Sequence, residues 1–366
     1  MRITFPNLGS MHIFCKAIAK AASIPYQLPP PTTDETRELG EYYTNESVCL
    51  PLKIILGNFI QALELGADTI VMVGSGPPCR LGVYDRTIKT ILDDLGYSYR
   101  WLTIPGLFNW QAFLQNKAEA DQLRRELTPR NYLAFPGALR LGWKKMRCCE
   151  QLEHAAMRKR AVAADPRQVD QALKHGLQAL DEAASLKELS TGAREALDRL
   201  KSLPETGYSP LKVVMVGEVY TVMEPSINLD IERRLGYLGV EVHRSSYFSS
   251  HIRRGSRLDR RLLRQREQLL SLARPYLNYD VGAECNVSVA ESVQAAQEGF
   301  DGAVHVYPFS CMPETNAAAV LSAVGPEIGL PVLGLPLDRK DMDVRLNTQI
   351  EAFVDIMHMR RSGRSA

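Results

Sequence analysis

The short run Thr69–Val73, rich in β-branched residues and closed by Gly74-Ser75-Gly76, is the feature of the sequence that most constrains the fold. Such a run suits a strand that is buried on both faces, as strands are in parallel sheets. The sequence around it alternates between strand-like and helix-like patterns, with strands predicted at Arg2–Phe5 and Ser98–Ile104 and helices at Met11–Ala22, Leu52–Gly66 and Tyr84–Leu95. This alternation predicts an α/β domain over residues 1–108, with a doubly wound and mostly parallel sheet.

The composition changes between residues 109 and 203, where charged residues, Ala, Leu and Gln dominate and glycine becomes scarce. We expect a helical bridge there, including helices at Pro166–Ala184 and Leu186–Leu203. After the linker Pro204–Gly207 the alternation resumes and predicts a second α/β domain over residues 204–366. Its strands are expected at Leu211–Val216, Val240–His243, Ala303–Tyr307 and Pro331–Gly334, and its helices at Ile227–Leu238, Ser288–Gly299, Thr315–Val324 and Thr348–Arg360. The expected architecture is therefore two Rossmann-like domains, a helical bridge and a ligand cleft between the domains.

Composition and charge exclude several classes of protein. The 366 residues are 45% hydrophobic and 23% charged, as in ordinary globular proteins, and the formal net charge is +2. Such a charge predicts neither a nucleic-acid nor a membrane partner. No apolar stretch approaches the roughly 18 residues that span a bilayer, and the apolar run at the start is too short for a signal-peptide core. We therefore expect a cytoplasmic protein.

The sequence has seven cysteines, an odd number, and no two of them form a Cys-x-x-Cys motif. A disulfide scaffold is not expected in a long chain without a secretory signal, and metal binding or simple burial are the remaining explanations. Three of the cysteines lie beside prolines, which make rigid loops. Cys79 and Cys311 each follow a predicted strand, where α/β sheets collect ligands, and Cys49 begins a predicted helix. Spacing alone leaves open whether these three bind a metal or are buried as small apolar residues.

Three segments that contain these cysteines resemble those of the 2-hydroxyacyl-CoA dehydratase and benzoyl-CoA reductase superfamily. They are Glu46–Lys53, Gly76–Tyr84 and Pro308–Glu314. The sequence is most similar to the branch described as CoA protein activase-related, or 2-hydroxyglutaryl-CoA dehydratase D-component-like. The resemblance covers nearly the whole chain and includes the Pro-rich loop Pro29–Thr32, the motif Gly217–Tyr220 and the segment Glu224–Asn228.

The resemblance implies one [4Fe–4S] cluster held by Cys49, Cys79 and Cys311 between Rossmann-like domains. It also implies low-potential electron transfer for radical dehydration or reduction of an acyl-CoA-like substrate. The implied partners are a separate ATP-dependent activator protein and a homologous subunit or a second copy of the chain. A non-catalytic, electron-transferring subunit and a structural zinc protein are the alternatives.

The chain departs from the family in some respects. No P-loop and no recognisable CoA-binding segment are present. Cys15, Cys148, Cys149 and Cys285 match none of the family's ligand motifs. A double-cubane [8Fe–9S] cluster would need about six cysteine ligands, and adjacent Cys148 and Cys149 in a helix would not both point at one cluster.

Other polar residues lie beside the cysteines. Lys53 and Arg80 are candidates to offset the negative charge of a cluster, and Glu46 and Glu314 are candidate acid–base residues. For Glu314, a role near the start of a helix is the alternative. His305 is interpreted as a structural histidine rather than as a cluster neighbour. Glu218, Glu224 and Asn228 follow a predicted strand and are candidates to line the same cleft, and the pattern leaves this open. The arginines between His251 and Glu267 indicate a solvated helix face or a docking patch for an acidic partner, and less so a contact to CoA phosphates: Arg253, Arg254, Arg257, Arg260, Arg261, Arg264 and Arg266.

Overall fold

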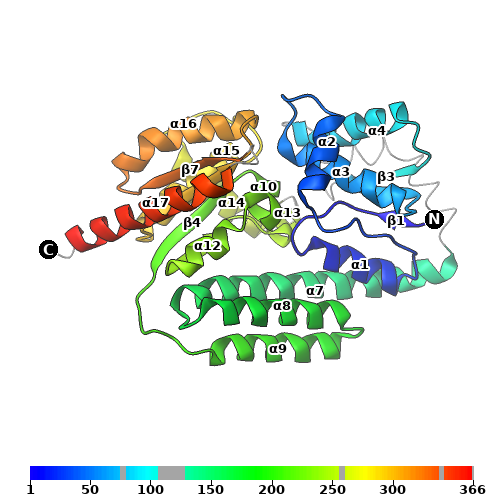
Figure 1. Ribbon diagram of the computed structural model, residues 1–366, viewed down its shortest axis with the longest axis horizontal. Helices are drawn as coiled ribbons and strands as arrows, with labels where there is room; N and C mark the ends of the chain where they lie inside the picture. Colours follow the sequence, from blue (N-terminus) through cyan, green and yellow to red (C-terminus); the bar gives the residue numbers. More distant parts are fainter. Residues whose placement is uncertain (75–79, 106–127, 255–259, 338–341, 365–366) are drawn as a thin grey trace. The chain divides into compact units, whose positions relative to one another are not determined.

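The computed structural model describes residues 1–74, 80–105, 128–254, 260–337 and 342–364 (Figure 1). Over these residues the protein is an α/β protein with two sheets, and all strand pairings in both sheets are parallel. The chain forms two compact units, one of residues 1–146 and 248–262 and the other of residues 147–247 and 263–366. The expected α/β class is confirmed, and the predicted division at residues 108 and 203 stays a prediction.

The first unit contains a three-stranded sheet in the order β1-β2-β3. The strands are β1 (Ile3–Thr4), β2 (Thr69–Gly74) and β3 (Arg100–Pro105), with Thr69 of the central strand opposite both Ile3 and Arg100. The helical segments are α1 (Met11–Ala21), α2 (Asp34–Tyr42), α3 (Leu50–Glu64), η1 (Arg80–Val83), α4 (Tyr84–Asp94) and α13 (Phe248–Arg254). The elements predicted between residues 2 and 104 are confirmed to within two residues at each end. Helix α2 was not predicted.

Helices α2 and α3 cross in direct backbone contact. A Cβ atom on Gly40 would lie 1.8 Å from the carbonyl oxygen of Lys53, and one on Gly57 would lie 2.0 Å from that of Thr36. No side chain fits at either position, so two glycines permit the close approach. The first turn of α3, whose N-cap residue is Cys49, is buried.

Three helices follow one another along the chain, α7 (Pro129–Val162), α8 (Pro166–Glu182) and α9 (Leu186–Ser202). Asp165 and Ser185 cap α8 and α9 by accepting hydrogen bonds from backbone N–H groups in the first turns. The predicted helices Pro166–Ala184 and Leu186–Leu203 are confirmed. Residues 106–127, which include the start of the predicted bridge, lie outside the described residues.

The second unit contains a four-stranded sheet in the order β5-β4-β6-β7 (Figure 1). The strands are β4 (Leu211–Gly217), β5 (Val240–Arg244), β6 (Gly302–Tyr307) and β7 (Val332–Pro336). The remaining helices are α10 (Val219–Met223), α11 (Pro225–Asn228), α12 (Ile231–Tyr237), α14 (Arg260–Ala273), α15 (Cys285–Gln297), α16 (Met312–Glu327) and α17 (Met342–Arg364). Because β5 lies on one side of β4 and β6 on the other, the chain reverses its direction of winding between β4 and β6.

Two hydrophobic clusters cover the two faces of this sheet. Val213 and Met215 of β4 point toward α12 and α17, whereas Val214 and Val216 point toward α15 and α16. The two-residue alternation of a strand thus supplies both cores, which is why these strands are almost wholly apolar.

The sequence pattern was wrong about one helix. A single helix was expected over Ile227–Leu238, but α11 ends at Asn228 and α12 begins at Ile231. Leu229 and Asp230 both adopt the left-handed conformation, with φ of 57° and 55°, and this conformation cannot continue a right-handed helix. The apolar spacing carries through the break, which is why periodicity alone did not reveal it.

Within the described part of the chain, no helix is both long enough and apolar enough to cross a membrane.

Candidate functional site

Cys311 is the N-cap residue of helix α16 in the second unit, and its side chain is buried. It follows strand β6 by a turn in which its N–H donates to the carbonyl of Pro308 at 2.9 Å. Its own carbonyl accepts from the N–H and the hydroxyl of Thr315, at 2.9 and 2.8 Å. Unpaired N–H groups at a helix start favour a thiolate over a thiol, so this position suits a cysteine that binds a metal.

Cys49 has the same local setting in the first unit. It is the buried N-cap residue of α3, and Pro51 stands two residues after it just as Pro313 stands two residues after Cys311. Proline in the first helical turn costs no hydrogen bond, because the amide at that position has no partner within the helix. The sequence Cys-x-Pro therefore produces the same cysteine-capped helix start twice.

Lys53 lies one turn after Cys49, and its side chain is buried. Its ammonium group donates to the backbone carbonyl of Glu46 at 3.5 Å. The carboxylate of Glu46 is not the acceptor, and Glu46 itself is exposed. The structure thus connects Lys53 to the segment before Cys49 through the main chain.

Cys79 and the side chain of Arg80 lie outside the described residues. Among the residues that are described, no group of three His, Cys, Asp or Glu side chains is arranged to hold a metal ion. Cys79 lies outside these residues, so the structure does not test the predicted three-cysteine set. The set therefore stays a prediction.

The carboxyl ends of β4 and β6 lie side by side where the winding reverses, and ligands of open α/β sheets bind at such a switch point. Gly217 ends β4 with φ of 140°, and a Cβ atom there would lie 1.8 Å from the carbonyl oxygen of Val306. That carbonyl accepts a hydrogen bond from Glu218 N–H at 3.1 Å. Gly217 and Glu218 therefore contact strand β6 directly, through close packing and one backbone hydrogen bond. Strand β6 is followed by the segment that leads to Cys311.

A buried polar cluster of His305, Glu314 and Ser288 lies beneath this edge. His305 Nε2 is 2.7 Å from Glu314 Oε2, and Ser288 Oγ donates to the same carboxylate oxygen at 3.0 Å. His305 and Glu314 are fully buried and Ser288 nearly so. Among the residues that the structure describes, the other oxygen of Glu314 and Nδ1 of His305 have no hydrogen-bond partner. A carboxyl group and an imidazole in direct contact are the two kinds of side chain that most often act together as an acid–base pair.

Glu314 is not a helix cap, although it lies in the first turn of α16. Its side chain bonds to a strand residue and to Ser288 of α15, and the N–H of Cys311 is bonded to Pro308 instead. His305, interpreted from sequence as a structural residue, is the direct partner of this candidate acid.

Other ionisable groups near Glu314 have raised pKa values. Burial raises the pKa of Glu218, and the charge of Glu314 adds to the effect, against the opposing hydrogen bonds from Thr221 and Tyr220. Burial and the charge of Glu314 also raise the pKa of Tyr307, whose ring stacks on His305 with centroids 4.5 Å apart. Each shift favours the uncharged form, which limits the negative charge around Glu314.

Glu224 and Asn228 have structural roles. Glu224 caps α11 and accepts from the hydroxyl of Ser226 at 2.6 Å, and the buried amide of Asn228 donates to the carbonyls of Thr221 and Val222. These bonds hold the short helices that follow β4. The side-chain oxygen of Asn228 is buried and has no hydrogen-bond partner among the described residues.

The remaining cysteines lie in packed positions. Cys148 and Cys149 are adjacent and buried in α7, and Cys285 is buried at the start of α15. Burial, together with the charges of Glu314 and Asp280, raises the pKa of Cys285 to about 12, and burial alone raises that of Cys15 to about 12. A thiol with such a pKa is a poor metal ligand at neutral pH.

Sequence reasoning missed Ser288 and the pairing of His305 with Glu314. The available signal was a polar residue inside an apolar strand, Ala303-Val304-His305-Val306, because such a residue needs a buried partner.

A comparison with models of known protein families found no match, and neither did a comparison with curated protein sequences.

Proposed function

We propose that the chain is an iron–sulfur protein in which Cys49, Cys79 and Cys311 hold one [4Fe–4S] cluster. The observation that carries the proposal is the shared setting of Cys49 and Cys311, each a buried cysteine at the N-cap of a helix with proline two residues later. Three thiolates leave one iron of such a cluster without a protein ligand, and this iron can take a substrate atom.

The proposed reaction is low-potential reduction or radical dehydration of an acyl-CoA-like substrate, primed by a separate ATP-dependent activator. When bound, the cluster supplies the electron. The carboxyl group of Glu314, held by His305 and Ser288, would donate the proton that accompanies the reaction when protonated, or accept it when ionised. Glu46 is proposed as a second acid–base residue, and the charges of Lys53 and Arg80 would offset that of the cluster.

The proposed architecture consists of two Rossmann-like domains with the cluster in a cleft between them. Its support within the second unit is a parallel sheet with helices on both faces, a switch point between β4 and β6, and Cys311 next to that point. In the first unit, β2 is parallel to both of its neighbours, and Cys79 follows it in the sequence after five residues.

The test is anaerobic purification followed by quantification of iron, sulfide and zinc and by EPR of the dithionite-reduced protein. We expect about four irons and four sulfides per chain. The variants Cys49→Ala, Cys79→Ala and Cys311→Ala should each lose the cluster. Cys148→Ala, a buried cysteine in a helix, is the matched control and should keep it.

Stoichiometric zinc, or no metal after anaerobic handling, would refute the proposal. Equal loss of iron from Cys148→Ala would show that the losses report unfolding. Circular dichroism of every variant distinguishes that case. About eight irons per chain would also contradict the single cluster.

A further inference from the structure

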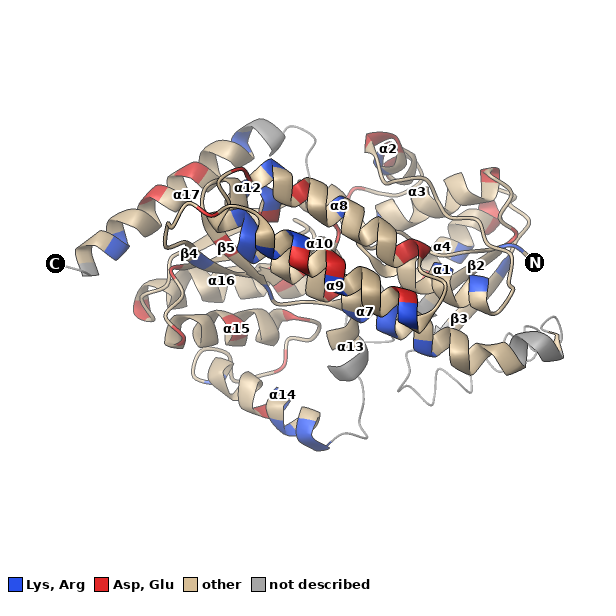
Figure 2. Ribbon diagram, turned by 90° about the horizontal axis from the view of Figure 1, so that it is seen from below, with Lys and Arg blue, Asp and Glu red and all other residues tan. Residues whose placement is uncertain are grey.

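The last turns of helix α14 (Arg260–Ala273) pack on the core of the second unit. Ala273 is its single buried residue, and Leu269 and Leu272 lie partly buried against the core of the second unit. The first turns are exposed and carry Arg260, Arg261, Arg264 and Arg266. Figure 2 shows this concentration of basic residues over the amino-terminal part of α14.

Most of the positive charge on α14 is not neutralised. Its one acidic residue, Glu267, is bonded to Arg274 beyond the end of the helix. Arg260, Arg264 and Arg266 form no ion pair with any residue that the structure describes. The helix therefore presents at least three unpaired guanidinium groups to solvent.

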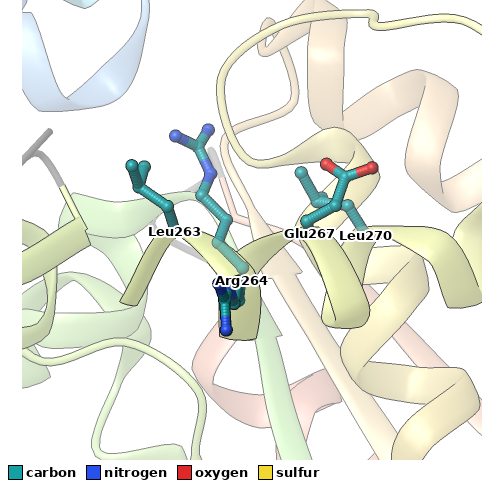
Figure 3. A pocket seen from close by; sticks show the side chains of 5 residues that line it. Leu263, Arg264, Glu267 and Leu270 are labelled. Carbon is teal, nitrogen blue, oxygen red and sulfur yellow. The ribbon is translucent and has the colours of Figure 1, made fainter. Parts of the chain in front are cut away.

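A shallow cavity of 430 Å³ lies along the same helix (Figure 3). Leu263 and Leu270, two turns apart, form its apolar part, and Arg264, Arg266 and Glu267 form its polar part. Leu263 is 39% exposed although it belongs to an ordered helix. Apolar side chains rimmed by arginines are typical of a protein-binding surface.

Helix α2 carries the complementary pattern. Its buried face, with Thr36 and Gly40, contacts α3, and its outer face presents Asp34, Glu35, Glu38 and Tyr42. Tyr42 is 81% exposed, the second most exposed large hydrophobic side chain of those described. Asp34 and Glu35 form no ion pair with any described residue.

The two exposed stripes match in spacing as well as in charge. Asp34, Glu35 and Glu38 stand at positions i, i+1 and i+4 of one helix, and Arg260, Arg261 and Arg264 stand at the same positions of the other. Residues at these positions lie on one helix face. Two helices with such faces can place opposite charges along the whole length of their contact.

We propose that α14 is a docking surface for α2 of a second copy of this chain. The acidic stripe of α2 meets the arginines of α14, and the Tyr42 ring of the second copy enters the cavity between Leu263 and Leu270. Tyrosine and arginine are the residues that most often dominate protein interfaces, and an arginine against a tyrosine ring adds cation–π attraction. The inference does not rest on the proposed cluster.

The composition of the surface favours a protein partner over a nucleic acid or a lipid. No aromatic residue lies on α14 for stacking on bases. Leu269 and Leu272 are already packed against the core of the second unit, so little apolar area of α14 remains for insertion into a bilayer. A matching acidic and aromatic helix, in contrast, is present in the chain itself.

The test is sedimentation velocity of the full chain over a range of concentrations at low and high salt. We expect self-association that weakens at high salt, because the contact is mainly between exposed charges. The basic reversal R260E/R264E and the acidic reversal D34K/E35K should each be at least tenfold weaker in self-association. The matched control K174E/K187E reverses two exposed lysines of α8 and α9 and should associate like the wild type.

Mixing the two reversed variants is the decisive step. Contacts between unlike variants then pair opposite charges in both directions: the acidic α14 of R260E/R264E faces the basic α2 of D34K/E35K, and the unchanged α14 of D34K/E35K faces the unchanged α2 of R260E/R264E. We therefore expect the mixture to associate as the wild type does. A wild-type chain that is monomeric throughout would overturn the proposal. So would a control that weakens as much as the reversals, or a mixture that stays monomeric. Binding of the wild type to anionic phosphatidylserine vesicles, lost in R260E/R264E alone, would instead assign α14 to a lipid surface and also overturn it.

Discussion

His305 and Glu314, nine residues apart in the sequence, meet in the interior of the second unit with Nε2 and Oε2 separated by 2.7 Å. Strand β6 supplies the imidazole and helix α16 the carboxylate, with the Cys311 turn between them. The proposed metal ligand Cys311 thus lies between the two members of the pair along the chain.

Removal of either partner should destabilise the protein strongly. His305→Ala leaves the buried Glu314 carboxylate without its imidazole, and loss of one partner of a buried pair costs about 3–5 kcal/mol of unfolding free energy. Ser288→Ala removes one hydrogen bond and should cost about 1 kcal/mol. Urea unfolding measures both. The double variant H305F/E314L, which removes both polar groups, should be more stable than His305→Ala. A double variant that is less stable than the single one would contradict a charge-based explanation.

Cys285 should resist alkylation in the native protein. Its pKa of about 12, raised chiefly by burial, means that only about one molecule in ten thousand carries the thiolate at pH 8. Iodoacetamide should therefore modify Cys285 far more slowly in native protein than in urea-unfolded protein, as measured by mass spectrometry of its peptide. Rapid native alkylation would show that the thiol is neither buried nor near a negative charge.

The ionised carboxylate of Asp68 should stabilise the folded protein only at pH values above the pKa of Asp68. Partial burial alone would raise its pKa, but hydrogen bonds from Thr69, Arg2 N–H and Arg100 lower it to about 2. A lowered pKa stabilises the folded state above the unfolded value of about 4, and this stabilisation is lost as the pH falls toward 2.

Asp68→Asn should therefore destabilise the protein at pH 7, by at most about 1 kcal/mol because Asp68 is half exposed. The difference from the wild type should shrink progressively between pH 4 and pH 2. Urea unfolding over this range tests the sign, and a difference that grows toward low pH would contradict it.

Gly57→Ala should disrupt the contact of α2 with α3. The added methyl group would lie 2.0 Å from the Thr36 carbonyl oxygen, so the helices must separate at a cost of about 3 kcal/mol or more. The matched control is Gly192→Ala in α9, where the nearest atom would be 3.9 Å away. There alanine should stabilise the protein by about 0.5–1 kcal/mol, because it is the better helix former. Thermal unfolding should shift in opposite directions for the two variants, and a common direction would refute the packing argument.

Local sequence patterns predicted most of the strands and helices correctly. The run Thr69–Val73 became β2, and Ala303–Tyr307 became β6, because strands buried on both faces need continuous apolar residues. Helix α2 was not predicted because it contacts α3 through the backbone at Gly40 and Gly57, and such a contact leaves no apolar periodicity. The break between α11 and α12 at Leu229 and Asp230 was not predicted either, because the apolar spacing continues through it.

The candidate site was predictable only in part. The positions of Cys49 and Cys311 at helix starts follow from Cys-x-Pro, which acts over three residues. The partners of Glu314 come from α15 and β6, separated from it by 26 and 9 residues. No local pattern specifies which buried polar groups will meet across such distances.

The sequence by itself determined the order of the strands and of most helices along the chain, and a helix start near Cys49, because these depend on interactions between near neighbours along the chain. Only the tertiary structure decided the strand order β5-β4-β6-β7 and the burial of His305 with Glu314 and Ser288. The physical reason is that a buried polar group must find its hydrogen-bond partner among whatever residues the packing of the sheet and its helices brings beside it.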